Sequence, residues 1–446
     1  MDPVFSPPAA VLHIMDRLRE NGHDACLVGG CVRDILLGHL PADWDICTAA
    51  HPQTVLTLFP GSLDTGAKHG TVTVLQPSRN ASGRFPVEVT SWRSETGHSD
   101  HRHPDAVRFS DNLETDLSRR DFTINAMAWN PEKGLVDFFH GREDLARGLV
   151  RCVGDPMLRF REDALRMLRA VRFCSQLGFE LDADAVRAIR FQRDAISFVS
   201  RERTQHEMTR TLMGQCPSRA SLWWETGLAS PMFSEIGTLP DDPGFALSCM
   251  DRFPPDEMTN GTVYDGMNQL LPDDAAINEK SHHAHQGDSI DESVFPWAVF
   301  WKACGLSSRI GTVSRWMHEN RFPRKRAAGV KKLLQMDADG MPDTLRNLRL
   351  TALAEGTAWL EASLRLRNLT VGSPVPDMAG LDIPALVLDG NGLMAAIAPL
   401  EPPRGQEFGA WMDCLRMSVC ENPSCNRADL LGIFATAMAS AFQAHS

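Results

Sequence analysis

The 446-residue sequence has no long apolar run and no excess of positive charge. No stretch approaches the roughly 20 apolar residues that a membrane helix needs, and Asp2 stands where a secretory signal would carry basic residues. We therefore expect a cytoplasmic protein. The formal net charge of −12 disfavours a protein that coats nucleic acid indiscriminately, although it is compatible with a local basic groove.

The 11 cysteines lack the paired spacing of a zinc site or a disulfide framework. We expect reduced, mostly buried thiols. Cys420 and Cys425 come closest to a metal-binding pair, but no second pair follows them. The histidine-rich "SHHAH" lies within residues 254–294, a segment rich in Pro, Gly, Asp and Asn. We interpret this segment as a flexible insertion with solvated histidines.

The pattern of apolar residues changes along the chain. Up to about residue 140, strand-like runs such as "GTVTVLQ" and "FPVEVTSW" alternate with short helical segments. Beyond that point helical periodicity predominates, and "REDALRMLRAVRF" predicts one continuous helix. The sequence therefore predicts mixed strands and helices followed by an all-helical part.

The stretch "DWDI" places two carboxylates one residue apart. In a strand, Asp43 and Asp45 point to one face and Trp44 to the other. Adjacent like charges repel unless a cation lies between them, which predicts a Mg²⁺ site at Asp43 and Asp45. Glu88, between two valines of another predicted strand, is a candidate third carboxylate, although solvent-facing glutamates are common there. Two Mg²⁺ ions so held would activate an attacking hydroxyl and stabilise a pyrophosphate leaving group.

A glycine pair and an arginine precede the two aspartates. Gly29 and Gly30 follow a predicted strand and allow a ligand to approach the backbone, and the next helix can offer N–H groups to phosphate. Arg33, in the first turn, can grip phosphate oxygens in a fork. Alone, this pattern could be a tight turn with a surface arginine. Arg119 and Arg120 could cap a helix or help to neutralise a triphosphate.

Asp163, Arg166, Arg169 and Arg172 recur every three residues and predict a polar stripe on one helix. The stripe could be a surface ladder of ion pairs. We favour base recognition, in which Asp163 accepts from an exocyclic amine while Arg166 donates to the neighbouring ring atom. Cytosine and adenine share that edge, whereas uracil and guanine place a carbonyl there. Arg169 and Arg172 would hold the triphosphate or the primer.

Three motifs, "LVGGCVRDILLG…DWDI", "RRDFTINAMA" and "RFREDALRMLRAVRFCSQLGF", resemble those of the class II tRNA nucleotidyltransferase and bacterial poly(A) polymerase family. The resemblance implies an α+β fold with a mixed α/β head like that of DNA polymerase beta at 1–140. It also implies a helical neck at 141–210, a helical body at 211–335 and a helical tail at 336–446, with tRNA along the helical part. It implies metal binding by Asp43 and Asp45 and nucleotide contacts by Gly30, Arg33, Arg120, Asp163, Arg166, Arg169 and Arg172.

The resemblance further implies an enzyme that adds CCA to tRNA 3′ ends from CTP and ATP, with Mg²⁺. "TGAKHGTVTVL" and residues 93–109 resemble CCA-adding enzymes more than poly(A) polymerases, the alternative within the family. The alternative from another class is a non-catalytic tRNA-binding protein. His98 and Asn391 depart from the family pattern, and the often fused HD phosphohydrolase domain has no counterpart. One basic segment is either an RNA contact or a solvated helix; its cations are Arg321, Arg324, Lys325, Arg326, Lys331 and Lys332.

Overall fold

The computed structural model describes residues 5–77, 84–96, 106–110, 112–237, 240, 251, 293–306 and 308–338. The chain divides into two compact units, Met1–Asp273 with Trp316–Phe322, and Asp274–Arg315 with Pro323–Ser446. Several predictions fall on residues outside the described ranges. They concern His98, most of 254–294 with its histidines, Asn391, Cys420, Cys425 and nearly all of the expected tail.

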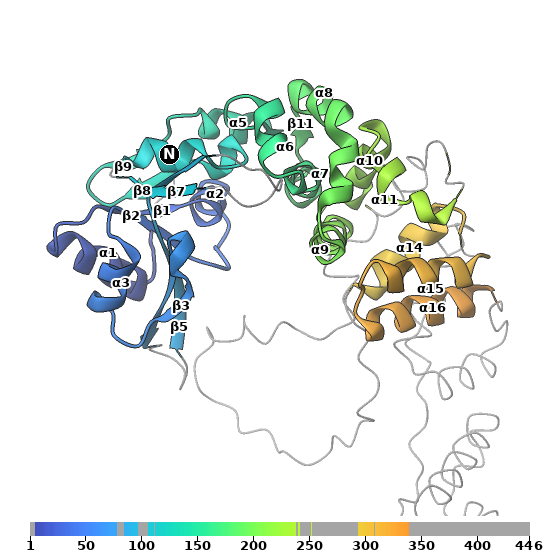
Figure 1. Ribbon diagram of the computed structural model, residues 1–446, viewed down its shortest axis with the longest axis horizontal. Helices are drawn as coiled ribbons and strands as arrows, with labels where there is room; N and C mark the ends of the chain where they lie inside the picture. Colours follow the sequence, from blue (N-terminus) through green and yellow to red (C-terminus); the bar gives the residue numbers. More distant parts are fainter. Residues whose placement is uncertain are drawn as a thin grey trace, which may run out of the picture. The chain divides into compact units, whose positions relative to one another are not determined.

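A seven-stranded mixed sheet occupies the N-terminal part of the first unit, in the order β3-β4-β5-β2-β1-β8-β9 (Figure 1). Its strands are β1 (Ala25–Val28), β2 (Asp45–Thr48), β3 (Leu63–Gly66), β4 (Thr71–Pro77), β5 (Arg84–Ser91), β8 (Ala128–Asn130) and β9 (Gly134–Val136). β2 and β5 run parallel, and the other neighbouring strands run antiparallel. β1 is buried along its whole length, which explains its unbroken apolar sequence. β6 (Arg93–Thr96) and β7 (Ala106–Phe109) form a separate pair.

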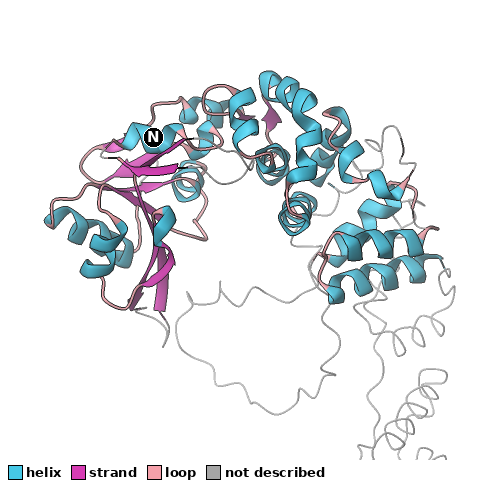
Figure 2. Ribbon diagram, in the orientation of Figure 1, coloured by secondary structure: helices cyan, strands magenta, loops and turns pink. Residues whose placement is uncertain are grey.

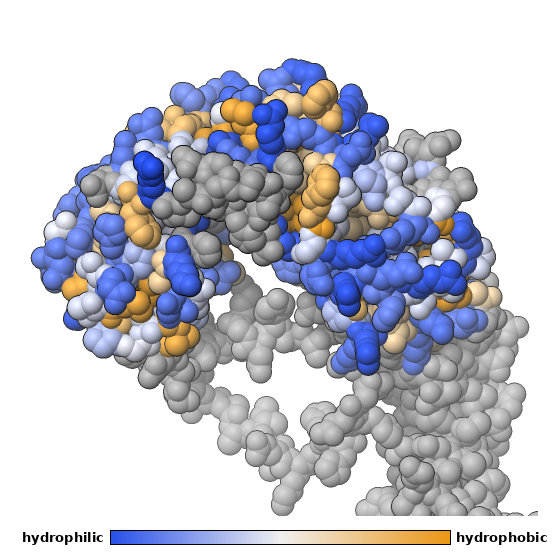
Figure 3. Space-filling model, in the orientation of Figure 1, coloured by the Kyte–Doolittle hydropathy of each residue, from blue (hydrophilic) through white to orange (hydrophobic). Residues whose placement is uncertain are grey.

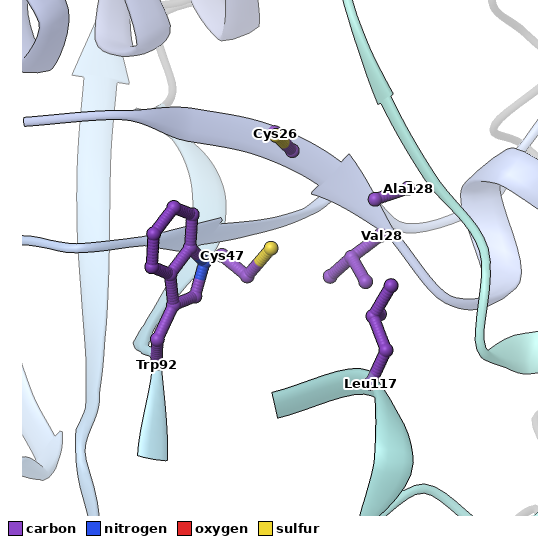
Figure 4. Close-up of a cluster of buried hydrophobic side chains, with 6 residues drawn as sticks. All are labelled: Cys26, Val28, Cys47, Trp92, Leu117 and Ala128. Carbon is purple, nitrogen blue, oxygen red and sulfur yellow. The ribbon is translucent and has the colours of Figure 1, made fainter. Parts of the chain in front are cut away.

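Helices α1 (Ala9–Glu20) and α3 (Pro52–Leu58) lie side by side against the sheet (Figure 1). α1 buries Val11, Ile14, Met15 and Leu18, which share one helical face. Figure 4 shows a further cluster that joins strands β1, β2 and β8 to α4 (Leu113–Ser118); its members are Cys26, Val28, Cys47, Trp92, Leu117 and Ala128. This packing fixes the strands whose ends carry the candidate site.

The other described residues of the first unit are almost wholly helical (Figure 2). It contains η2 (Thr123–Asn125), α5 (Gly141–Arg147), α6 (Pro156–Glu162), α7 (Leu165–Leu177), α8 (Ala183–Gln192), η3 (Arg193–Phe198), α9 (Arg201–Leu212), η4 (Pro217–Ser221), α10 (Leu222–Glu225), α11 (Ala229–Met232) and η5 (Ser234–Ile236). β10 (Leu149–Val150) and β11 (Glu180–Leu181) form a short parallel pair. α7 packs on α9, and α6 packs on α8. The change from mixed structure to helices is confirmed.

Helices α14 (Val294–Ala303) and α16 (Arg324–Ala338) pack together in the second unit. α14 is buried from Val294 to Trp301, and Trp297 stacks on Trp301 with ring centroids 5.7 Å apart. α15 (Ile310–Glu319) begins in this unit and ends in the first. The face seen in Figure 3 is mostly hydrophilic over α15 and α16.

The prediction of one continuous helix over residues 161–173 is wrong. α6 ends at Glu162 and α7 begins at Leu165, because Asp163 adopts an extended conformation with φ −144° and ψ 107°. Its carboxylate accepts a hydrogen bond from the backbone N–H of Leu165 at 3.0 Å and so caps the first turn of α7. Asp163 therefore lies before the helix that carries the arginines.

The cysteine prediction is confirmed for the part of the chain that the structure describes. Every cysteine there is a free thiol, and all except Cys216 are buried. Within the same part of the chain, the helices are too short or too polar to cross a membrane.

Candidate functional site

Three carboxylates gather where β2 begins. Asp45 is the first residue of β2 and lies in register with Glu88 on the parallel strand β5. Asp43 precedes the strand and is exposed, whereas Trp44 is only 7% exposed. The strand starts later than the sequence indicated, yet the alternation of exposed aspartate and buried tryptophan is as predicted. Glu88 is also exposed between buried valines, as predicted.

The carboxylate group of Asp45 is held in an unfavourable environment. The pKa of Asp45 is raised from its ordinary 3.8 to about 6, chiefly by burial and also by the charges of Glu88 and Asp43, while Arg120 opposes them. The ionised cluster thus carries more negative charge than its protein surroundings neutralise. A cation between these oxygens would remove the penalty.

The carboxylates are suited to an ion that is shared with a substrate. Among the residues that the structure describes, no three His, Cys, Asp or Glu side chains are placed so that they could hold a metal ion by themselves. Mg²⁺ usually takes one or two carboxylates and completes its octahedron with waters and substrate phosphates. The pair of Asp43 and Asp45, with Glu88 beside it, fits that pattern.

Gly29 brings the backbone close to these charged groups. It has φ +78°, and a Cβ at this position would lie 3.0 Å from Nη1 of Arg120 and 3.9 Å from Oδ2 of Asp45. A larger residue would be strained and crowded at once. At Gly30, the first residue of α2 (Gly30–Leu36), a Cβ would meet only Nη2 of Arg33, at 3.7 Å. The need for glycine is therefore stronger at Gly29 than at the predicted Gly30.

Arg33 is fixed beside this turn by two side chains. Its Nη1 donates to Oδ1 of Asn125 at 2.7 Å, and its Nε and Nη2 donate to Oδ1 of Asp34 at 2.9 and 2.7 Å. Asn125 lies in η2, within the "RRDFTINAMA" motif. The structure therefore brings the first and second sequence motifs together.

Arg119 and Arg120 share a buried anchor that the sequence interpretation missed. Asp116 is fully buried in α4; it lies 2.6 Å from Nη2 of Arg119 and 3.6 Å from Nη2 of Arg120. The spacing of three and four residues is the signal that could have revealed this anchor. The second interaction holds Arg120 near Asp45.

Asp163 lies just before α7 and Arg166 lies in its first turn, but each already has a protein partner. Oδ2 of Asp163 accepts from Nη2 of Arg203 at 2.8 Å. Nη1 of Arg166 donates to Oε2 of Glu162 at 2.5 Å, and its Nη2 donates to the carbonyl of Arg119 at 3.1 Å. Arg203 and Glu162 were absent from the predicted site. They restrict both side chains to defined positions.

Arg169 and Arg172 lie farther along α7 and differ in exposure. Arg169 contacts Oδ2 of Asp121 at 2.6 Å and keeps 34% of its side chain exposed. Arg172 contacts Oε2 of Glu207 at 2.5 Å with 5% exposed, and its Nη1 donates to Gln176 at 2.7 Å. Arg169 is therefore open to a ligand, whereas a contact of Arg172 with a nucleotide stays a prediction.

We expect the Asp121→Asn variant to lose a pH-dependent part of the stability. Burial alone would raise the pKa of Asp121, but the charges of Arg169 and Arg166 outweigh it and lower the pKa to about 2. The stabilisation is complete above the ordinary pKa of 3.8 and disappears as the pH falls towards 2. The free energy of unfolding at pH 7 should fall by about 2 kcal/mol, measured by urea denaturation.

Below pH 4 the difference between the wild type and Asp121→Asn should shrink, since protonation removes the same charge. Asp16→Asn, at an exposed position of α1, is the control and should leave the profile unchanged. A constant difference from pH 7 to pH 2 would contradict the assignment.

Two family models match separate parts of the first unit. Residues 25–151 match the poly A polymerase head domain, and residues 178–238 match the probable RNA and SrmB-binding site of polymerase A. Over these two parts the chain is similar to the poly(A) polymerase family. The first match contains the carboxylates and the glycine turn, so the α+β fold and the family resemblance are confirmed.

Relatives within this family are named CCA-adding enzymes. That of Geobacillus stearothermophilus is 44% identical over 229 residues, which are 51% of this chain and 54% of the relative. That of Lactobacillus helveticus is 46% identical over 201 residues, 45% of this chain and 49% of the relative. The chain thus spans about half the length of the curated relatives it matches.

A solved structure resembles nearly the whole chain. The crystal structure of the Bacillus stearothermophilus CCA-adding enzyme in complex with CTP has a TM-score of 0.69 and 27% identity, and the match covers 99% of this chain and 100% of that one. Nucleotidyltransferases of this family generally use divalent metal ions, which agrees with the surplus of carboxylates beside Asp45.

Proposed function

We propose that the protein adds C, C and A to the 3′ ends of tRNA from CTP and ATP, without a template and with Mg²⁺. The observation that carries this proposal is the register of Asp45 with Glu88, beside a glycine turn and several fixed arginines. The similarity to CCA-adding enzymes, one of them solved with CTP, supports the choice of substrates.

In this proposal Asp43 and Asp45 hold Mg²⁺, with Glu88 as a third carboxylate. The ion would favour ionisation of the tRNA 3′ hydroxyl and neutralise charge on the triphosphate. Gly30 and Arg33 would contact phosphate oxygens, and Arg120 would add a further positive charge near Asp45. Pyrophosphate leaves as the new phosphodiester bond forms.

Asp163 and Arg166 are the proposed readers of the base. A carboxylate can accept about four hydrogen bonds, and two at Asp163 are already taken by Leu165 and Arg203. Capacity therefore remains for the exocyclic amine of cytosine or adenine. The hydrogen bond from Arg166 to Glu162 would keep the guanidinium from turning away when no base is present.

We propose the same division of the chain as the family resemblance implies. The head would be 1–140, the neck 141–210, the body 211–335 and the tail 336–446, with tRNA along the helical part in the cytoplasm. The exposed Arg321, Arg324, Lys325 and Lys331, with the partly exposed Arg326 and Lys332, would contact its phosphates. Positions 324–332 all lie on α16.

The deciding experiment supplies the purified protein with tRNA that lacks its 3′ CCA. We expect two added residues with CTP alone and three with CTP and ATP together, read on a sequencing gel. Long A-tails from ATP alone would indicate a poly(A) polymerase instead. Binding of tRNA with no incorporation would indicate the non-catalytic alternative.

The Arg166→Ala variant should discriminate poorly between nucleotides. Loss of one good base contact is worth about 1 to 3 kcal/mol, so the preference for CTP over UTP should fall by roughly 5- to 150-fold. The ratio of kcat/KM values for the two nucleotides measures this. Arg187→Ala, at an exposed position on α8, is the matched control. An unaltered ratio in Arg166→Ala would remove Arg166 from base reading.

A further inference from the structure

Three guanidinium groups share one phenyl ring. The ring centroid of Phe173 lies 5.3 Å from Cζ of Arg33, 5.7 Å from Cζ of Arg169 and 4.1 Å from Cζ of Arg172. Phe173 is 5% exposed and lies on α7, while Arg33 comes from α2. The ring thus joins the cations of two motifs that are far apart in the sequence.

Ion pairs alone do not explain why the guanidinium groups of the three arginines lie close to one another. Each guanidinium has its own carboxylate, namely Asp34 for Arg33 at 2.7 Å, Asp121 for Arg169 at 2.6 Å and Glu207 for Arg172 at 2.5 Å. These pairs neutralise the arginines separately, and like charges still repel across the cluster. The negative face of an aromatic ring attracts cations within about 6 Å of its centroid, so the ring is a contact that all three have in common.

The three arginines of the cluster differ in exposure. The side chain of Arg172 is 5% exposed, that of Arg33 is 13% exposed and that of Arg169 is 34% exposed. Phe122 closes the ring from another side, in an edge-on contact with centroids 5.6 Å apart. Arg172 is therefore buried, and Arg33 and Arg169 are the members that a ligand can reach.

The position along α7 indicates which part of a nucleotide the cluster meets. Phe173 lies seven residues after Arg166, or ~10 Å along the helix axis at 1.5 Å per residue. The ring therefore lies well away from the proposed base readers. Arg33 is the arginine of α2 that contacts the ring of Phe173. It follows the glycine turn beside Asp45, where phosphates would lie.

We propose that Phe173 is a positioning residue that assembles Arg33 and Arg169 into one site for the phosphates of the incoming nucleotide. The inference rests on the proposed nucleotidyl transfer and deepens it. Without the ring, Arg33 would keep Asp34 and Asn125 and Arg169 would keep Asp121, but the two guanidinium groups would lose the aromatic contact that they share. Each nucleotide would then have to order both arginines as it binds.

The test compares steady-state kinetics of Phe173→Leu with those of the wild type. Leucine keeps an apolar side chain but removes the ring, so KM for CTP and for ATP should rise by the same factor, about tenfold. The inhibition constant of inorganic pyrophosphate should rise in parallel, since this probe has phosphates and no base. We expect kcat to change by less than about threefold, and Phe173→Tyr to restore KM.

Phe160→Leu is the matched control, because Phe160 is a fully buried phenylalanine of α6 outside the proposed site. It should lower the melting temperature while leaving KM and the pyrophosphate inhibition constant unchanged. An unchanged KM in Phe173→Leu, or a fall in kcat alone, would overturn the inference. So would equal defects in the leucine and tyrosine variants. A wild type that incorporates no nucleotide would instead defeat the proposed function.

Discussion

The Asp45→Asn variant is expected to incorporate nucleotides slower than the wild type by a factor on the order of 10³. Asparagine keeps the size of the side chain but removes the negative charge that would bind Mg²⁺. Burial and the neighbouring charges hold the pKa of Asp45 at about 6. The negative charge that the substitution removes is therefore one that lowers the stability of the metal-free protein. Asp43→Ala should have a similar effect and leave tRNA affinity within a few-fold.

The same substitution should not destabilise the metal-free protein. A folded-state pKa above the ordinary 3.8 means that ionisation of Asp45 lowers stability as the pH rises from about 4 to about 6. Asparagine avoids this loss, so the free energy of unfolding in EDTA at pH 7 should rise by about 1 to 2 kcal/mol.

The gel assay and urea denaturation together separate the two effects. Asp16→Asn serves as the control, since its position on α1 is exposed and far in sequence from the cluster. Full activity of Asp45→Asn would exclude Asp45 from the reaction. An inactive variant that is also less stable in EDTA would instead point to a structural role.

The Gly141→Ala variant should be strongly destabilised. A Cβ at Gly141 would overlap the carbonyl oxygen of Thr123 and lie 2.9 Å from Cγ of Met127. Close packing leaves no room for this atom, so we expect a loss of about 3 kcal/mol in the free energy of unfolding. Any movement of Thr123 would also shift Asn125, which holds Arg33, so nucleotide binding should weaken as well.

Gly311→Ala is the matched control for this substitution. Both glycines lie in the first turn of a helix, but no atom lies within 4 Å of a Cβ built at Gly311. Alanine there should raise stability by about 0.5 to 1 kcal/mol, because it loses less backbone entropy on folding. Urea midpoints of the two variants give the comparison. Similar midpoints would show that the α5 contact is not tightly packed.

Local patterns predicted most of the elements that carry the candidate site. The glycine turn, the strands around Asp45 and Glu88 and the helix that carries Arg166 follow from periodicity and turn residues. The break at Asp163 was missed because the apolar spacing continues across it. At this position the carboxylate of Asp163 accepts a hydrogen bond from the backbone N–H of Leu165. This side-chain bond competes with the helical backbone bonds, and α6 ends at the preceding residue.

The partners of the charged residues could not be predicted in the same way. Arg203 reaches Asp163, and Glu207 reaches Arg172, from α9. Such contacts depend on how two helices pack, which periodicity does not specify. The sequence placed Arg172 on a polar stripe, whereas packing against α9 buries it beside a carboxylate.

The parallel pairing of β2 and β5 limits how this part of the chain can vary. β4 ends at Pro77 and β5 begins at Arg84, so a change in the number of residues between these two positions need not alter which residue of β5 faces Asp45. A one-residue deletion inside β5 before Glu88 would place Val89 opposite Asp45 and turn the glutamate towards the apolar core. Homologous sequences can therefore differ in the length of the β4–β5 connection, whereas the number of residues in β5 before Glu88 must stay constant.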